Sequence, residues 1–122
     1  MNPPRIEPHC RPLARGSAPL VGPVLDGLQA ELHPDWRVAA GPCLARRFES
    51  RDYPGLLKLL AQIGSLAQAE DHHPEMELAW GRLEVSISTH SIGGLSMNDF
   101  VLAAGIDRIA TSSRPEASTM SG

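Results

Sequence analysis

The pattern of apolar and polar positions divides the chain into alternating helical and extended segments. Apolar residues recur at spacings of three and four over residues 53–67, which is the period of an amphipathic helix. Strict alternation over residues 82–89 puts Leu83, Val85 and Ile87 on one face, as in a strand with one covered side. With the shorter segments between them, the pattern predicts the order α-β-β-α-β-β-α.

The shorter segments are weaker versions of the same two patterns. In chain order they are a helix over residues 24–32, strands over 36–40, 43–50 and 75–80, and a last helix over 96–110. We expect Pro34 to end the first helix, because a proline excludes helical geometry at the residue before it. The predicted apolar faces include Val24 on the first helix, Tyr53 and Leu57 on the long helix, and Trp80 on the third strand.

These elements predict an α+β fold, in which a four-stranded antiparallel sheet carries three helices on one face. The other face of the sheet would remain in water or pair with another subunit. We expect one folded domain over residues 24–110. Residues 1–23 hold six of the eleven prolines and few large apolar side chains. They predict a disordered Pro-rich N-terminal segment, because burial cannot offset their ordering entropy. Residues 111–122 predict a flexible C-terminal tail.

Composition narrows the functional classes. The formal net charge of -3 argues against a broad electrostatic surface for direct nucleic-acid binding. The chain has no apolar run of about 20 residues to span a membrane and no apolar core of a secretory signal. The two cysteines, Cys10 and Cys43, do not suggest a disulfide framework. We therefore expect a cytoplasmic protein.

The most unusual local feature is a pair of neighbouring histidines, His72 and His73, just after the long helix. One interpretation is that they only solvate the end of that helix, where a charged imidazole interacts well with the dipole. Pro74 favours an extended backbone at His73, so the two rings are expected to point in different directions. One ring can then face a pocket while the other packs or orients it.

Other polar residues lie at the ends of neighbouring elements. His90 ends the fourth strand, and Ser96 with Asp99 forms the capping box that opens the last helix. Asp99 also shares the inward face of that helix with Leu102 and Ala103. Its carboxylate is expected either to cap the helix only or to take part in a site as well.

Metal and nucleophilic chemistry fit this pattern less well. The histidines and acids lack the H-x-x-x-H and C-x-x-C spacings of zinc sites, so no metal site is expected. Cys43 has no histidine near it in sequence, and Gly93-Gly94 lacks the pattern of a phosphate-binding loop. The chemistry that fits the pattern best is acid–base catalysis by histidines, since imidazole gives and takes protons near neutral pH.

Three separated motifs, "EDHHPE", "STH" and "GLSMND", resemble the pterin-4a-carbinolamine dehydratase family, also known as the dimerisation cofactor of a homeodomain transcription factor. The stretch "AWG…STHSIGGLSMNDFVLAAGID" is similar to the bacterial branch. The resemblance implies the same α-β-β-α-β-β-α fold. It also implies dehydration of 4a-hydroxytetrahydrobiopterin to quinonoid dihydropterin, a step of tetrahydrobiopterin recycling, without a metal or organic cofactor. A homodimer or homotetramer is implied as well.

By this resemblance, three histidines are catalytic, and the pterin lies between two groups of residues. The expected catalytic residues are His72, His73 and His90, with His72 and His90 assigned to proton transfer and His73 to binding or orienting the ring. The expected substrate-binding residues are Asp71, His72 and His73 on one side and Ser88, Thr89, His90 and Ser91 on the other. Asp99 is expected to hold a histidine tautomer.

One position departs from the family pattern. Four residues before the first histidine of the pair, the family often has a charged side chain, whereas this chain has Gln68, which does not titrate. Two rival functions follow from relatives of the family. One is a non-catalytic protein that assists Rubisco assembly, and the other is a protein partner of a transcription factor.

Overall fold

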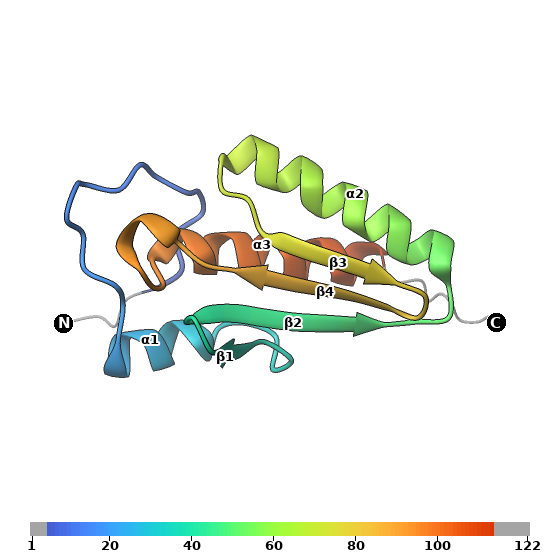
Figure 1. Cartoon of the computed structure of the whole chain (residues 1–122), viewed down its shortest axis with the longest axis horizontal. Coiled ribbons are helices and arrows are strands. Elements are labelled where there is room, and N and C mark those ends of the chain that lie inside the picture. Colours follow the sequence, from blue (N-terminus) through green and yellow to red (C-terminus); the bar gives the residue numbers. More distant parts are fainter. Residues whose placement is uncertain (1–4, 114–122) are drawn as a thin grey trace.

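The computed structural model describes residues 5–113 and confirms the predicted order of elements and the α+β class (Figure 1). The elements are α1 (Gly22–Gln29), β1 (Arg37–Ala39), β2 (Cys43–Glu49), α2 (Tyr53–Glu70), β3 (Glu75–Ala79), β4 (Arg82–Ile87), the 3-10 turn η1 (His90–Ile92) and α3 (Met97–Ser113). The sheet has the order β1-β2-β4-β3, with every neighbouring pair antiparallel. Within the described residues, no helix has the length and apolar content needed to cross a membrane.

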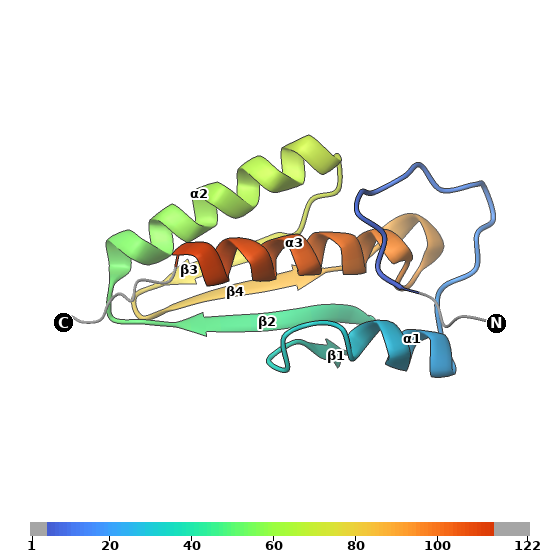
Figure 2. The ribbon, with the colours of Figure 1, turned by 180° about the vertical axis from the view of Figure 1, so that it is seen from behind.

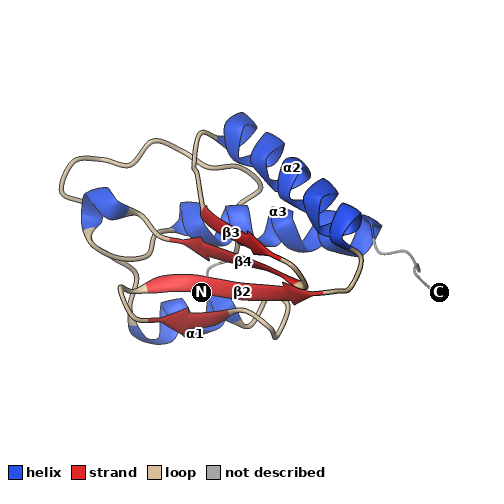
Figure 3. Ribbon diagram, turned by 45° about the vertical axis from the view of Figure 1, so that its right-hand side comes forward, coloured by secondary structure: helices blue, strands red, loops and turns tan. Residues whose placement is uncertain are grey.

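The core lies between the sheet and the helices, which Figure 3 shows on the same side of the strands. Leu83, Val85 and Ile87 of β4 are buried, as the alternation predicts. Leu44 of β2 pairs with Ile87 in the ladder and is also buried on this face. The opposite face of the sheet is more polar, and on it an Arg47–Glu84 ion pair bridges β2 and β4 over 2.7 Å.

Three predictions about the apolar faces are wrong in detail. Trp80 is 71% exposed, because β3 ends at Ala79 and Trp80 belongs to the turn of the hairpin. Tyr53 and Leu57 are also exposed on α2. That helix has leucines on several sides, and the buried stripe is Leu56, Leu59, Ile63 and Ala67.

The first helix begins and ends earlier than the sequence indicates. It ends at Gln29, and the N–H groups of Glu31 and Leu32 donate to carbonyls three residues back, so the chain tightens before it turns at Pro34. Leu28 and Leu32 remain buried, whereas Val24 is 40% exposed. At the other end of the chain, α3 runs to Ser113, and residues 114–122 of the expected tail lie outside the described residues.

Residues 5–21 contain no helix or strand, and we call them the N-terminal strap. The strap loops past η1 and the start of α3, as the two opposite views show (Figures 1 and 2). Ile6 and Leu20 pack against the core, and the Leu20 N–H donates to the carbonyl of Leu95 over 2.8 Å. The prediction of a disordered segment did not include these contacts.

Candidate functional site

The site is built where α2, β4 and α3 begin or end at one side of the sheet. At the end of α2, Asp71 takes the left-handed conformation with φ 53°. The N–H of His72 then donates to the carbonyl of Ala67 over 3.1 Å, and the N–H of Asp71 donates to Gln68 over 3.3 Å. These two bonds form a Schellman motif, which stops the helix and turns the chain toward His72 and His73.

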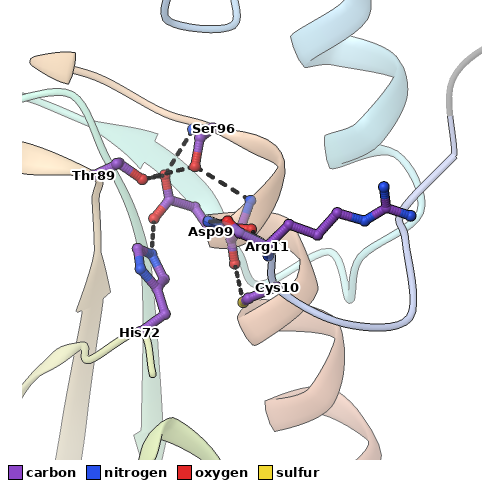
Figure 4. A network of polar contacts seen from close by, with 7 residues as sticks. Cys10, Arg11, His72, Thr89, Ser96 and Asp99 are labelled. Carbon is purple, nitrogen blue, oxygen red and sulfur yellow. Dashed lines mark hydrogen bonds and ion pairs between the residues drawn. The ribbon is translucent and has the colours of Figure 1, made fainter. Parts of the chain in front are cut away.

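Asp99 is the centre of a buried polar network (Figure 4). It occupies the third position of α3 and is fully buried. Its Oδ2 atom accepts hydrogen bonds from the Ser96 N–H and the Thr89 hydroxyl, both at 2.8 Å. The bond to Ser96 is half of the predicted capping box, so the cap exists. The carboxylate, however, does more than cap the helix.

The second oxygen of Asp99 binds His72. The Nε2 atom of His72 lies 2.6 Å from Oδ1, and the His72 side chain is only 14% exposed. Since a carboxylate accepts, the bond puts a ring proton on Nε2, so that in the neutral imidazole Nδ1 carries the lone pair. The structure therefore joins the acid and one of the histidines that sequence reasoning placed together.

A hydroxyl pair completes the network. The Thr89 and Ser96 oxygens are 2.8 Å apart, and the Asn98 N–H donates to the Ser96 oxygen over 3.2 Å. Thr89 also pairs through its backbone with Gly94, which closes the short loop that carries His90. Because Thr89, Ser96 and Asp99 are buried, each polar atom depends on these partners rather than on water.

His73 points away from this network. Its Nε2 atom lies 3.1 Å from Oε1 of Gln68, which belongs to the last turn of α2. With the amide oxygen as acceptor, this contact also assigns the ring proton to Nε2. The divergence of the two rings agrees with the extended geometry expected before Pro74. Gln68, which sequence reasoning noted only as a departure, is the partner of a site histidine.

A cleft of about 240 Å³ lies beside the network. Four of the expected site residues line it, namely His73, Ser88, Thr89 and His90. Asp71, His72 and Ser91 are not among its lining residues; Asp71 and Ser91 are exposed, and His72 is directed to Asp99. The geometry thus places two histidines on the cleft and the third on the buried carboxylate.

Further lining residues were missed by sequence reasoning. They are Ala40, Gly41, Pro42, Cys43, Glu75, Ser86, Gly93 and Gly94. Ser86 carried a signal, because it shares the polar face of its strand with Ser88. Residues 40–43 reach the cleft only because β2 pairs with β4, and nothing in the local sequence gives that pairing. Among the described residues, no three His, Cys, Asp or Glu side chains converge in a way that could hold a metal ion.

Comparisons with known proteins agree with this architecture. Residues 24–109 match the sequence model of the family described as "Pterin 4 alpha carbinolamine dehydratase". A protein of Alkaliphilus metalliredigens named "Putative pterin-4-alpha-carbinolamine dehydratase" is 37% identical over 102 residues, which covers 84% of this chain and 92% of the relative. A relative of the same name from Rubrobacter xylanophilus is 39% identical and covers 84% of this chain and 95% of the relative.

Two solved structures share the fold. The transcriptional coactivator/pterin dehydratase from Brucella melitensis superposes with a TM-score of 0.70 at 28% identity, covering 75% of this chain and 98% of that one. A pterin dehydratase-like protein identified as a RuBisCO assembly factor in the alpha-carboxysome superposes with a TM-score of 0.54 at 20% identity, covering 64% and 92%. At that identity the second likeness concerns the fold alone. The sequence matches and the first structure establish that this chain belongs to the pterin 4 alpha carbinolamine dehydratase family.

Proposed function

We propose that the chain dehydrates a 4a-hydroxytetrahydropterin to the quinonoid dihydropterin, as in tetrahydrobiopterin recycling. The observation that carries the proposal is a pair of histidines on one cleft, with a third histidine bound to the buried carboxylate beside it. His73 and His90 line it, and His72 is fixed beside it by the buried carboxylate of Asp99. Family membership supplies the class of substrate, and these residues supply the acid–base groups that the reaction needs.

The reaction is an elimination of water. The bond between C4a and its hydroxyl oxygen breaks, and an acidic imidazolium protonates the departing hydroxyl so that it leaves as water. A basic imidazole takes a proton from a ring nitrogen, and the electron pair left on that nitrogen forms the new C=N bond. One proton is given to the departing hydroxyl and one is taken from the ring nitrogen. The electron pair of the broken C–O bond leaves with the water, so the step has no net oxidation or reduction.

The division of labour among the histidines is the finer part of the proposal. The sequence interpretation assigned proton transfer to His72 and His90 and ring orientation to His73. His73 lines the cleft as His90 does, so it is equally able to contact the substrate. His72, with its proton fixed on Nε2 by Asp99, offers a basic Nδ1. Two of the three therefore exchange protons with the pterin while the third orients it.

Single variants with an activity assay test both parts. Purified wild-type chain should accelerate the decay of a 4a-carbinolamine produced by a pterin-dependent hydroxylase. The variants H72A, H73A and H90A should separate into two that lose kcat by about 100-fold or more, as expected for acid–base groups, and one that mainly raises KM. If micromolar wild-type protein does not accelerate the decay, the proposed activity is overturned and a protein-binding role is favoured instead.

The expected surroundings of the enzyme belong to the same proposal. A homodimer or homotetramer would use the sheet face or edge that the helices leave open, and size-exclusion chromatography with light scattering gives the number of subunits. A cytoplasmic location, a pterin as the small-molecule substrate, and no direct binding of nucleic acid or membranes complete the proposal.

A further inference from the structure

The N-terminal strap binds the two helix ends that carry His72 and Asp99. It precedes residues 24–109, which match the family, and two of its side chains, Ile6 and Leu20, pack against the core. The three consecutive residues His9, Cys10 and Arg11 also reach both α2 and α3. The pattern of these contacts indicates a role beyond covering the surface.

The contact with α3 is made by Asn98, directly before Asp99. The Asn98 side-chain oxygen accepts from the Arg11 N–H over 2.9 Å, and the side-chain nitrogen donates to the Arg11 carbonyl over 2.8 Å. The thiol of Cys10 adds a weak bond to the Asn98 carbonyl at 3.5 Å. Asn98 is only 9% exposed, and both the oxygen and the nitrogen of its amide bond to the strap backbone.

The contact with α2 is made by Glu70, its last residue and two before His72. One carboxylate oxygen accepts from the Cys10 N–H over 2.7 Å, and the other lies 2.9 Å from Nδ1 of His9. The Glu70 side chain is 13% exposed, whereas that of His9 is 79% exposed. The bond from Cys10 is therefore the better shielded of the two, because solvent reaches the contact with His9.

From these contacts we propose that the N-terminal strap is a positioning element of the site, which holds the end of α2 and the start of α3 at the separation that the His72–Asp99 bond requires. Cys10 and Arg11 are adjacent in the chain, so the distance between Glu70 and Asn98 is limited to what one residue of backbone can span. A hydrogen bond of 2.6 Å tolerates little displacement, because its strength falls steeply with distance and angle. Glu70 and Asn98 are then positioning residues that act through their neighbours.

The consequence for turnover rests on the proposed dehydratase function, but the positioning itself does not. If the strap only covers apolar surface through Ile6 and Leu20, loss of its polar bonds should lower stability and leave the site geometry unchanged. If it positions the site, the same loss should loosen the bond between His72 and Asp99. The two possibilities predict different NMR signals for the Nε2 proton of His72.

The experiment compares N98A with R11A in the full chain. N98A removes both bonds to the Arg11 backbone, whereas R11A keeps them and removes only a side chain that is 75% exposed. In ¹⁵N-histidine-labelled protein, the Nε2–H of His72 should give a downfield, slowly exchanging proton signal, assigned by its absence from H72Q. We expect N98A to broaden or lose this signal and R11A to retain it.

Kinetics provide the second measurement. Misplacement of a catalytic group costs about 10- to 100-fold, so N98A should lower kcat by about that factor with KM within about twofold. E70A should act in the same direction, and E70Q, which keeps an acceptor for the Cys10 N–H, should recover most of the loss. If N98A does not fold, the E70A and E70Q pair makes the same comparison without a change in α3.

The outcomes separate the two proposals. An N98A chain with a lower Tm but an unchanged His72 signal and kcat would overturn the positioning role. A wild-type chain without dehydratase activity whose His72 signal is still lost in N98A would overturn the proposed function and support positioning by the strap.

Discussion

The Nε2 atom of His72 lies 2.6 Å from Oδ1 of Asp99, a carboxylate with no exposed surface. The other oxygen of Asp99 is occupied by Thr89 and by the Ser96 N–H. The carboxylate is therefore held from one side by the helix cap and directed at the imidazole on the other. This arrangement makes a helix-capping residue the hydrogen-bond partner that orients a candidate site histidine.

Replacement of Asp99 by asparagine should separate capping from orientation. The amide introduced by D99N keeps an oxygen for the Ser96 N–H but turns an N–H donor toward His72, which favours the tautomer with its proton on Nδ1 and removes the basic lone pair there. We expect kcat to fall by at least about 10- to 100-fold, the loss found when the hydrogen-bond partner that orients a metal-bound imidazole is removed. Steady-state kinetics with the 4a-carbinolamine measure this change.

A second carboxylate on the same helix provides the control. Asp107 binds Nη1 of Arg46 at 2.6 Å and Nε1 of Trp36 at 2.7 Å, about two turns farther along α3. D107N should lower the free energy of unfolding by about 1–3 kcal/mol through these bonds and leave kcat unchanged. Equal kcat values for D99N and the wild type would refute the orienting role of Asp99.

Thr89 should contribute to stability through its buried hydroxyl. Its oxygen bonds both Asp99 and Ser96 at 2.8 Å, and the residue is 7% exposed. T89V keeps the shape of the side chain but leaves polar partners unsatisfied, which costs about 1–3 kcal/mol. Urea denaturation should show this loss, whereas T89S, which keeps the hydroxyl, should stay close to the wild type. A T89V chain as stable as the wild type would mean that the network relaxes without it.

Much of the fold could be predicted because periodicity reports which side chains are buried. Leu83, Val85 and Ile87 alternate in the sequence and are buried in the structure. The same reasoning failed for Leu57 and Trp80, where a helix rich in leucine and a strand end leave the buried side undetermined. Packing against the neighbouring elements decides whether these two side chains are buried or exposed, and the local sequence does not show that packing.

The site was predictable only as far as its residues lie at the ends of elements. His72, His90 and Asp99 follow that rule, and the structure places His72 on Asp99. The contacts of Glu70 and Asn98 with the N-terminal strap had no such signal. They are hydrogen bonds to the backbone of a proline-rich segment, and the pattern of apolar residues cannot predict bonds of this kind.

Gln68 should matter for substrate binding more than for stability. Its side-chain oxygen lies 3.1 Å from Nε2 of His73, and both residues are exposed. Q68A frees the His73 ring, and a neutral hydrogen bond of about 0.5–1.5 kcal/mol corresponds to about a 2- to 10-fold loss in kcat/KM. Q68E keeps an acceptor and should retain activity. Kinetics of the two variants, with thermal melts as a check on folding, decide whether the amide is needed; a fully active Q68A would remove Gln68 from the site.

Cys10 should make the stability of the chain fall at alkaline pH. Burial, together with the negative charge of Glu70, raises the pKa of the Cys10 thiol from 9.0 to about 12. Between these two values the unfolded chain releases the thiol proton and the folded chain keeps it. The unfolded state then binds fewer protons, so the free energy of unfolding decreases as pH rises from about 9 toward 12.

Urea denaturation of the wild type and C10A at about pH 8, 9 and 10 measures this contribution. The difference in unfolding free energy between the two chains should shift in favour of C10A as pH rises, because C10A has no thiol to titrate at the strap. C43A serves as the control, since it keeps Cys10 and should follow the wild type. A difference between wild type and C10A that is constant with pH would show that the Cys10 thiol titrates alike in the folded and unfolded chains, and that Glu70 and burial do not hold its proton.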